Sequence, residues 1–292
     1  MNYTLILNRN RCIACILILG GCLAVSAMSS GAKVRWLVYY SDKASPDAFR
    51  EYQVIVLQSE NYPALRPRVG RGKTLLGYLS LGEVEQDREY FADVKAEKIL
   101  LQENENWKGS YFVDLRDPRW TKRVLDQLIP GILRRGFDGL FFDTLDNAPH
   151  LEQTDPDRYR GMTAAAVSLV RAIRLRYPGI KIMLNRAYEI LPQVEQQIDM
   201  ELGESVFADY DFGTKPYRLV QRDLYREQVK LLQAVQKRRP GLKIFTLDYW
   251  DPADIAGVTR IYREQRANGF EPYVATVELD RIVREPREES KP

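Results

Sequence analysis

The stretch GFDGLFFD, residues 136–143, decides the fold because it joins the end of a basic helix to a buried strand. Arg134 and Arg135 come directly before it, where basic side chains face the negative end of a helix dipole. Gly136 supplies the left-handed conformation that ends many helices. The apolar run that follows predicts a parallel strand buried on both faces, with Asp143 at its end. The stretch therefore predicts one turn of a repeated βα chain.

The same helix-to-strand turn recurs before three later apolar runs, at Tyr177–Gly179, Arg239–Gly241 and Ala267–Gly269. Helix starts are also marked, because Asp117-Pro118 and Asp251-Pro252 each place an N-cap acid before a proline. Eight strands are predicted, near Trp36–Tyr40, Val54–Gln58, Leu75–Leu81, Gly139–Asp143, Ile182–Asn185, Met200–Ser205, Ile244–Leu247 and Tyr273–Val277. Eight strands alternating with helices predict an α/β fold, a single (β/α)8 TIM barrel over residues 34–280. A doubly wound open sheet is the alternative.

Two segments of the chain lie outside this repeat. Residues 86–110 form a long excursion after the third strand, either a loop over the active face of the barrel or a solvated surface insertion. Residues 281–292 form a charged tail that is too short for a full final helix, and we expect it to be mobile. The 292 residues therefore predict one domain and no second.

The first 27 residues are typical of a secretory signal. Arg9 and Arg11 precede the apolar run Cys12–Leu19, which is too short to span a membrane. Two cleavage sites fit the residues that follow: one after Ala27, and a bacterial lipobox in which Cys22 is lipidated and becomes the new N-terminus. The chain is therefore expected to be exported, as a periplasmic, secreted or membrane-anchored lipoprotein that reaches the membrane only through a lipid anchor.

Composition excludes several kinds of chemistry. All three cysteines lie in the first 22 residues, which leaves the exported domain without a disulfide, a cysteine nucleophile or a cysteine zinc site. His150 is the sole histidine, so a multi-histidine metal site is impossible, and no GxSxG elbow accompanies it. Neither GxxxxGKS/T nor GxGxxG occurs, so these phosphate-binding loops are absent. The net charge of +3 is spread along the chain, which argues against nucleic acid as a partner.

Carboxylate chemistry and oxygen-ligand metal chemistry remain, and acids stand where a barrel places its active site. Catalytic groups of such barrels lie at the C-terminal ends of the strands. Six of the eight predicted strand ends supply an acid, and several supply aromatic residues. Aromatic faces stack on sugar rings, whereas carboxylates and amides bind hydroxyl or ammonium groups. The candidate substrate-binding residues at these ends are Tyr40, Tyr78, Glu83, Asp146, Asn185, Asp248, Tyr249 and Trp250.

Asp143 and Glu204 are the strongest catalytic candidates. Asp143 ends an apolar run in which an unpaired acid would be costly, and Glu204 stands in a similar setting. Two opposed carboxylates supply the nucleophile and the acid/base of glycosyl transfer. Structural explanations are open for the other residues: Asp248 as a helix N-cap, Tyr40 in packing, and Glu83 in an ion pair with a nearby arginine.

Four motifs resemble those of the endo-α-1,4-polygalactosaminidase family of glycoside hydrolases and its bacterial relatives of uncertain substrate. They are GYLSLGE at residues 77–83, YFVDLRDPRW at 111–120, GFDGLFFDT at 136–144 and ESVF at 204–207. They occur in the order expected for that family and span roughly residues 34–278. Together the four motifs are more specific than any one of them.

The resemblance implies a glycosidase that cleaves α-linked galactosamine-type exopolysaccharide within the chain. It places the nucleophile on Asp143 and the acid/base on Glu204, and it implies retention of configuration. Such a mechanism requires Glu204 to be protonated near neutral pH, which its apolar flanks favour. The resemblance also implies that Tyr40, Glu83 and other strand-end residues line the sugar site. We expect no cofactor, no bound metal and a monomer whose partner is the polysaccharide.

Two other functions stay open at this stage. Glu83, Asp143 and Glu204 offer oxygen ligands for Mg²⁺, so the barrel fits a metal-dependent enzyme as well. A catalytically silent carbohydrate-binding lipoprotein would use the same acids and aromatic residues only to hold a sugar chain. Dependence on a divalent ion distinguishes the first function, and binding without turnover distinguishes the second.

Overall fold

The computed structural model describes residues 33–63, 65, 72–214 and 216–287. The predicted signal segment and the lipidation candidate Cys22 lie outside the described residues. In the described part of the chain, no helix has both the length and the apolar character needed to cross a membrane.

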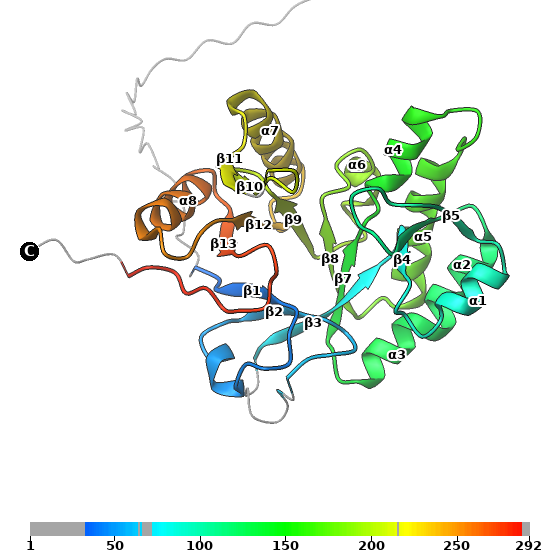
Figure 1. Ribbon diagram of the computed structural model, residues 1–292, viewed down its shortest axis with the longest axis horizontal. Helices are drawn as coiled ribbons and strands as arrows, with labels where there is room; N and C mark the ends of the chain where they lie inside the picture. Colours follow the sequence, from blue (N-terminus) through cyan, green and yellow to red (C-terminus); the bar gives the residue numbers. More distant parts are fainter. Residues whose placement is uncertain (1–32, 64, 66–71, 215, 288–292) are drawn as a thin grey trace, which may run out of the picture. The chain divides into compact units, whose positions relative to one another are not determined.

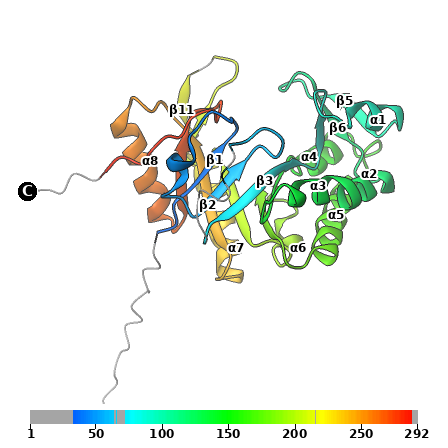
Figure 2. The ribbon, with the colours of Figure 1, turned by 90° about the horizontal axis from the view of Figure 1, so that it is seen from below.

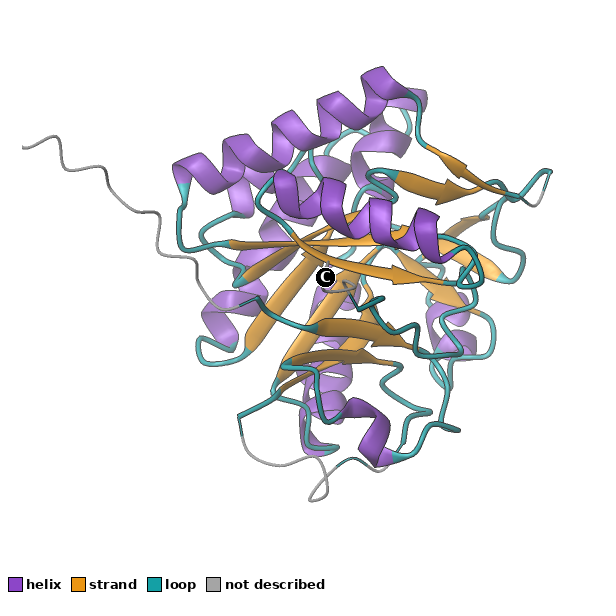
Figure 3. Ribbon diagram, turned by 90° about the vertical axis from the view of Figure 1, so that its left-hand side faces the viewer, coloured by secondary structure: helices purple, strands orange, loops and turns teal. Residues whose placement is uncertain are grey.

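Eight parallel strands form the sheet at the centre of the domain, surrounded by helices (Figures 1 and 3). In sheet order the strands are β1 (Trp36–Tyr39), β2 (Val54–Leu57), β3 (Thr74–Ser80), β7 (Gly139–Asp143), β8 (Lys181–Asn185), β9 (Met200–Glu204), β12 (Lys243–Tyr249) and β13 (Glu271–Ala275). Each predicted strand is found, and neighbours in the sheet are also successive barrel strands along the chain. The prediction of a (β/α)8 TIM barrel is confirmed.

The barrel closes where β13 meets β1, through side-chain and loop contacts. The indole N–H of Trp36 donates to the carbonyl of Glu271 at 2.8 Å, and the N–H of Tyr40 donates to the carbonyl of Leu279 at 2.7 Å. The Trp36 ring also packs edge-on against Phe245 and Tyr273 inside the barrel, at 5.2 Å and 5.8 Å between centroids. The barrel is therefore nearly closed.

The helices follow the strands around the barrel. They are η1 (Pro46–Phe49), α1 (Phe91–Ala96), α2 (Pro118–Arg123), η2 (Val124–Leu128), α3 (Ile129–Arg134), α4 (Asn147–Thr154), α5 (Met162–Arg176), α6 (Leu191–Val194), α7 (Arg222–Arg238) and α8 (Ile255–Ala267). Asp117 caps α2 as predicted, because its carboxylate accepts from the N–H of Arg119 at 2.9 Å. Asp251 does not open α8: Asp254 is the cap, accepting from the N–H of Gly257 at 2.9 Å.

Two additions to the barrel stand near the C-terminal ends of the strands (Figure 2). The excursion after β3 is folded: β4 (Glu83–Glu85), β5 (Leu100–Glu103) and β6 (Ser110–Val113) form an antiparallel sheet in the order β4-β6-β5. The second addition is an antiparallel hairpin of β10 (Ala208–Tyr210) and β11 (Tyr217–Leu219) directly after β9.

The tail after the barrel packs against it as far as Glu285, and residues 288–292 of the predicted mobile tail lie outside the described residues. Val283 is buried, and its N–H donates to the Tyr273 hydroxyl at 3.3 Å. Arg266 of α8 forms an ion pair with Glu285. The tail therefore covers the end of β13 where a full final helix is missing.

Candidate active site

Four side chains from successive barrel strands converge inside the barrel at the C-terminal ends of the strands. Asp143 ends β7, Asn185 ends β8, Glu204 ends β9 and Tyr249 ends β12. The amide nitrogen of Asn185 donates to Asp143 Oδ1 at 2.9 Å and to Glu204 Oε2 at 2.6 Å. The Tyr249 hydroxyl donates to the other Glu204 oxygen, Oε1, at 2.5 Å. The two predicted catalytic acids are therefore neighbours that share one hydrogen-bond donor.

The shared donor limits the separation of the two acids. Because both bond the same nitrogen, at 2.9 Å and 2.6 Å, Asp143 Oδ1 and Glu204 Oε2 lie at most 5.5 Å apart. Both side chains keep some exposure to solvent. The pair is thus close enough to act on one bond and open enough to meet a substrate.

Burial and mutual repulsion govern the protonation of the pair. Burial, with the negative charge of Glu204 second, raises the pKa of Asp143 to about 7, although the Asn185 amide opposes the shift. Glu204 accepts two hydrogen bonds, one at each carboxylate oxygen. The raised pKa keeps Asp143 partly protonated near neutral pH in the free site.

Two tyrosines form the wall of the site next to Asp143. Tyr40 and Tyr78 pack edge-on with ring centroids 5.3 Å apart. Burial raises the pKa of both hydroxyls, and the charge of Asp143 adds to the effect. Both hydroxyls are therefore protonated at physiological pH and can donate. The structure thus brings these two sequence candidates together with Asn185 and Tyr249 around the carboxylate pair.

The residue after each of three strand ends has a left-handed backbone. Thr144, Arg186 and Ser205 follow Asp143, Asn185 and Glu204, and their φ angles are 67°, 53° and 53°. This conformation costs roughly 1–2 kcal/mol in a non-glycine residue and collects at functional sites. The turn therefore leaves the strand sharply and directs each preceding side chain into the site.

Thr144 and Arg186 are site residues that the sequence reasoning missed. The Thr144 hydroxyl contacts Ser80 Oγ at 2.8 Å and accepts from the N–H of Gly82 at 2.8 Å, which ties the end of β7 to the loop after β3. Arg186 lies 3.6 Å from Asp146, the predicted candidate beside Asp143. Burial raises the pKa of Asp146, and Arg186 opposes that shift. Only the position of Thr144 at the end of a family motif pointed to it.

Glu83 is placed differently from the sequence prediction. It is buried, and its two oxygens accept from Asn104 at 2.8 Å, from Asn147 at 2.6 Å and from the Ser110 hydroxyl. These partners join the β4-β6-β5 sheet to the start of α4. The structure therefore supports a scaffolding role for Glu83 and does not support contact with a sugar.

Asp248 and Trp250 face away from the site, because side chains alternate along a strand and Tyr249 between them faces inward. Asp248 is 0% exposed; it accepts from the N–H groups of Phe207 and Ala208 and from the Gln265 amide. The indole of Trp250 donates to the α8 cap residue at 2.9 Å. The structure therefore does not support sugar contact for either residue.

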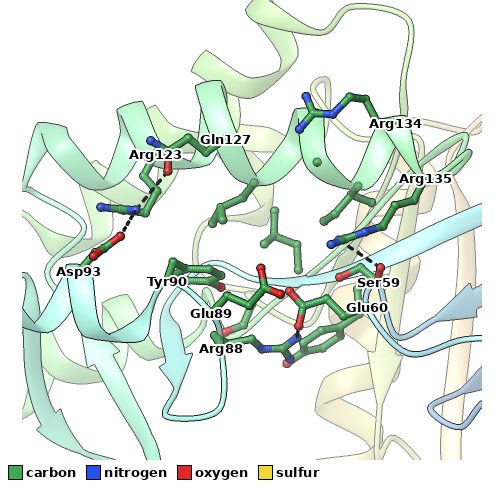
Figure 4. Close-up of a pocket in the computed structure, with 16 residues that line it drawn as sticks. Ser59, Glu60, Arg88, Glu89, Tyr90, Asp93, Arg123, Gln127, Arg134 and Arg135 are labelled. Atoms are coloured by element: carbon green, nitrogen blue, oxygen red, sulfur yellow. Dashed lines mark hydrogen bonds and ion pairs between the residues drawn. The ribbon is translucent and has the colours of Figure 1, made fainter.

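A cavity of about 360 Å³ lies between the loop after β4 and the α2–α3 region (Figure 4). Two ion pairs line it: Arg88 with Glu60 at 3.2 Å, and Arg123 with Asp93 at 3.9 Å. The Arg88 guanidinium also lies 5.8 Å from the centre of the Tyr78 ring. Neither Asp143 nor Glu204 lines this cavity, so it is separate from the catalytic pair.

The site does not group acids as a metal centre would. Among the described residues, no set of three or more histidine, cysteine or acidic side chains is placed to share a metal ion. Asp143 and Glu204 converge, but the third proposed ligand, Glu83, is bonded to three neighbours. The arrangement is that of a carboxylate pair.

A TIM barrel with two adjacent carboxylates at its strand ends defines the class of barrel glycosidases. The model of glycoside-hydrolase family GH114 matches residues 24–291. The glycoside hydrolase domain of PelA from Pseudomonas aeruginosa is 25% identical with a TM-score of 0.75, over 85% of this chain and 97% of that domain. Ega3 of Aspergillus fumigatus, solved in complex with galactosamine, shares the fold with a TM-score of 0.61 and 17% identity, over 86% of this chain and 94% of that one. A Deinococcus radiodurans protein is 28% identical over 229 residues, which are 76% of this chain and 70% of that protein.

Because the family model covers nearly the whole chain, the chain belongs to glycoside-hydrolase family GH114. The family resemblance seen in the four sequence motifs is thereby confirmed. The chain is a glycosidase.

Proposed function

We propose that this glycosidase cleaves α-linked galactosamine-type polysaccharide within the chain and with retention of configuration. One observation supports the mechanism above others: a single amide, that of Asn185, bonds both carboxylates. Retaining glycosidases hold their carboxyl groups about 5–5.5 Å apart, whereas inverting ones need about 6.5–9.5 Å to admit a water molecule. The limit of 5.5 Å between the bonded oxygens fits retention.

In this mechanism Asp143 is the nucleophile and Glu204 the acid/base. A carboxylate oxygen of Asp143 attacks the anomeric carbon while Glu204 gives its proton to the departing glycosidic oxygen. The resulting glycosyl-enzyme ester is then hydrolysed by a water molecule whose proton returns to Glu204. Tyr249 and Asn185 hold Glu204 in place by hydrogen bonds to its two oxygens.

The mechanism requires Asp143 to be ionised and Glu204 to carry a proton when substrate is bound. Burial raises the pKa of Asp143 to about 7, so substrate binding must favour the ionised form of this residue. A positive amino sugar next to Asp143 would favour its ionised form, and the glycosidic oxygen would take a proton from Glu204. Binding of a cationic sugar thus favours the protonation state that cleavage of the sugar chain requires.

The substrate class rests on the acids of the site and on the relatives. Asp143, Asp146 and Glu204 lie within electrostatic reach of one another, and Arg186 opposes the charge of Asp146. Such a site attracts an ammonium group. Ega3, which shares the fold, was solved with galactosamine. Together these observations favour a galactosamine-type polymer.

The proposal is tested by measuring the release of reducing ends from a panel of amino-sugar polymers. Wild type, Asp143→Asn and Glu204→Gln are compared, with and without a chelator. We expect release from galactosamine polymers by wild type alone, unchanged by the chelator. Loss of activity with the chelator would favour the metal-dependent enzyme. Binding by all three proteins without any release would favour the silent lipoprotein.

Export and lipidation stay predictions from the first 27 residues. The mass of the mature N-terminus distinguishes them: a diacylated Cys22 at the start supports the lipoprotein, and a start at residue 28 supports free secretion.

A further inference from the structure

Two hairpins from different parts of the chain meet through exposed aromatic side chains. Trp107 lies in the loop between β5 and β6, and Phe212 lies in the loop between β10 and β11. Their rings pack edge-on with centroids 5.0 Å apart. The two side chains are 55% and 52% exposed, which is unusual for such large apolar groups. Figure 2 shows the two hairpins rising on the same side of the barrel.

Each hairpin is anchored next to one of the catalytic acids. On one side, β10 begins four residues after Glu204, and the Ser205 hydroxyl bonds Asp209 at 2.9 Å. On the other side, Glu83 bonds Asn104 of the β5–β6 loop and Asn147 of α4, four residues after Asp143. A continuous series of contacts therefore runs from α4 beside Asp143, through Glu83 and the Trp107–Phe212 pair, to the hairpin after Glu204.

Two tyrosines of the β10–β11 hairpin extend the aromatic cluster from Phe212. The Tyr210 ring lies edge-on to Phe212 at 5.2 Å and to Tyr217 at 5.2 Å. Packing does not explain why Trp107 and Phe212 are aromatic, because about half of each side chain faces solvent. An aromatic pair of this kind contributes only about 0.5–1.5 kcal/mol beyond its buried area. A ligand that covers these faces would gain more from them than the fold does.

We infer that Trp107 and Phe212 form an aromatic bridge under which the substrate chain passes, and that the bridge binds a sugar unit remote from the cleaved bond. This inference rests on the proposed function. The ring faces offer apolar contact to a sugar ring and attraction to an ammonium group. Because the two hairpins are anchored next to Asp143 and Glu204, a chain held by the bridge also reaches that pair. The bridge thereby selects long chains over short ones.

The test compares galactosamine oligosaccharides of increasing length with the polymer. In the Trp107→Ala variant, kcat/KM for the polymer falls about tenfold, mostly through KM, which corresponds to about 1.4 kcal/mol. For a disaccharide-length substrate, kcat/KM falls less than twofold. Trp107→Phe, which keeps a ring, loses only about threefold on the polymer. Leu175→Ala on α5, which removes a side chain that is 86% exposed, is the control and has no effect on either substrate.

A binding measurement separates this inference from the proposed function. Galactosamine oligosaccharides of increasing length and the polymer are titrated into two inactive proteins, and binding is measured by calorimetry. The proteins are Asp143→Asn and Asp143→Asn combined with Trp107→Ala. We expect the affinity to rise with chain length in the first protein and this rise to be lost in the second. Equal affinities in the two proteins, or equal polymer turnover in wild type and Trp107→Ala, would overturn the bridge. Absence of turnover in wild type, with the length dependence intact, would overturn only the hydrolase.

Discussion

The inner and outer faces of the barrel carry titratable side chains on the same strands, but these groups differ in exposure and in hydrogen-bonding partners. On β9, Glu204 faces inward and Glu201 faces outward; on β12, Tyr249 faces inward and Asp248 outward. Glu204 is partly exposed and paired with Asp143 through Asn185. Both outer acids are 0% exposed.

The outer acids also differ from each other. Asp248 accepts three hydrogen bonds, which offset part of the cost of its burial. Neither carboxylate oxygen of Glu201 has a hydrogen-bond partner among the described residues, and burial raises its pKa well above the usual range. The direction set by the pleat therefore separates the proposed acid/base Glu204 from Asp248, which accepts hydrogen bonds from its neighbours, and from Glu201, which has no partner among the described residues.

The largest expected difference comes from the same substitution on the two faces. Asp143→Asn should lower kcat/KM by about 10⁴-fold, because it removes the proposed nucleophile. Asp248→Asn should change kcat/KM by less than about threefold, because its side chain meets no substrate. Initial rates of reducing-end release on one polymer measure both. Comparable losses in the two variants would break the distinction between the faces.

The second prediction concerns the pH dependence of stability. The pKa of Asp248 is raised from 3.8 to about 6 by burial. The folded state thus holds this proton more tightly, and the stability that it contributes below pH 3.8 is lost as the pH rises through about 6. This loss amounts to about 3 kcal/mol. Asp248→Asn should lack it.

Asp248→Asn is expected to fold because its partners can adapt. The new amide keeps an oxygen for the N–H groups of Phe207 and Ala208. Gln265 Oε1 is buried without a partner among the described residues, so rotation of that amide lets it accept from the new N–H. Urea unfolding at pH 4 and pH 7 provides the comparison with wild type. Equal pH slopes for the two proteins would show that Asp248 does not titrate in this range.

A smaller effect is expected from removing the donor that joins the catalytic acids. Asn185→Ala should lower kcat/KM by roughly 10²-fold at the pH optimum, because both carboxylates lose a partner. The Asn185 amide lowers the pKa of Asp143, so its loss raises that pKa further. If catalysis needs one proton on the pair, the alkaline limb near pH 7 should move to higher pH. An alkaline limb that does not move in Asn185→Ala would show that Asn185 does not affect the titration of the carboxyl pair.

The smallest expected effect is on the outer face of β9. Glu201→Met replaces a buried, unpartnered carboxyl by an apolar group of similar size and should stabilise the protein by about 1–2 kcal/mol. The gain should grow above neutral pH, where the wild-type carboxyl must stay protonated against the solvent. Chemical unfolding at pH 6 and pH 9 measures it, with Leu175→Ala as the control. Destabilisation at both values would reveal a partner for Glu201.

Much of the barrel could be predicted because buried parallel strands appear in the sequence as apolar runs that follow glycine-containing turns. Asp143 was predicted for the same reason, since an acid ending the run 139–142 needs a partner. The predicted strand at 244–247 ended two residues short of β12. Asp248 was therefore placed among the substrate-binding candidates at the strand end, without the alternation of side chains along β12 that directs it outward.

The rest of the site depends on contacts that no local pattern encodes. The left-handed backbone at Thr144 and Ser205 occurs in residues that rarely adopt it, so the composition gives no sign of it. The contact between Trp107 and Phe212 joins positions about a hundred residues apart along the chain. Only the folded barrel brings these residues together.

The proposed retaining pair of Asp143 and Glu204 is tested most directly by the configuration of the first product. Proton NMR recorded during early hydrolysis of an α-linked galactosamine oligosaccharide shows which anomer forms before mutarotation. We predict the α-anomer, with the β-anomer appearing later. Initial formation of the β-anomer would contradict the retaining pair, because Asp143 would then activate water and not attack the sugar.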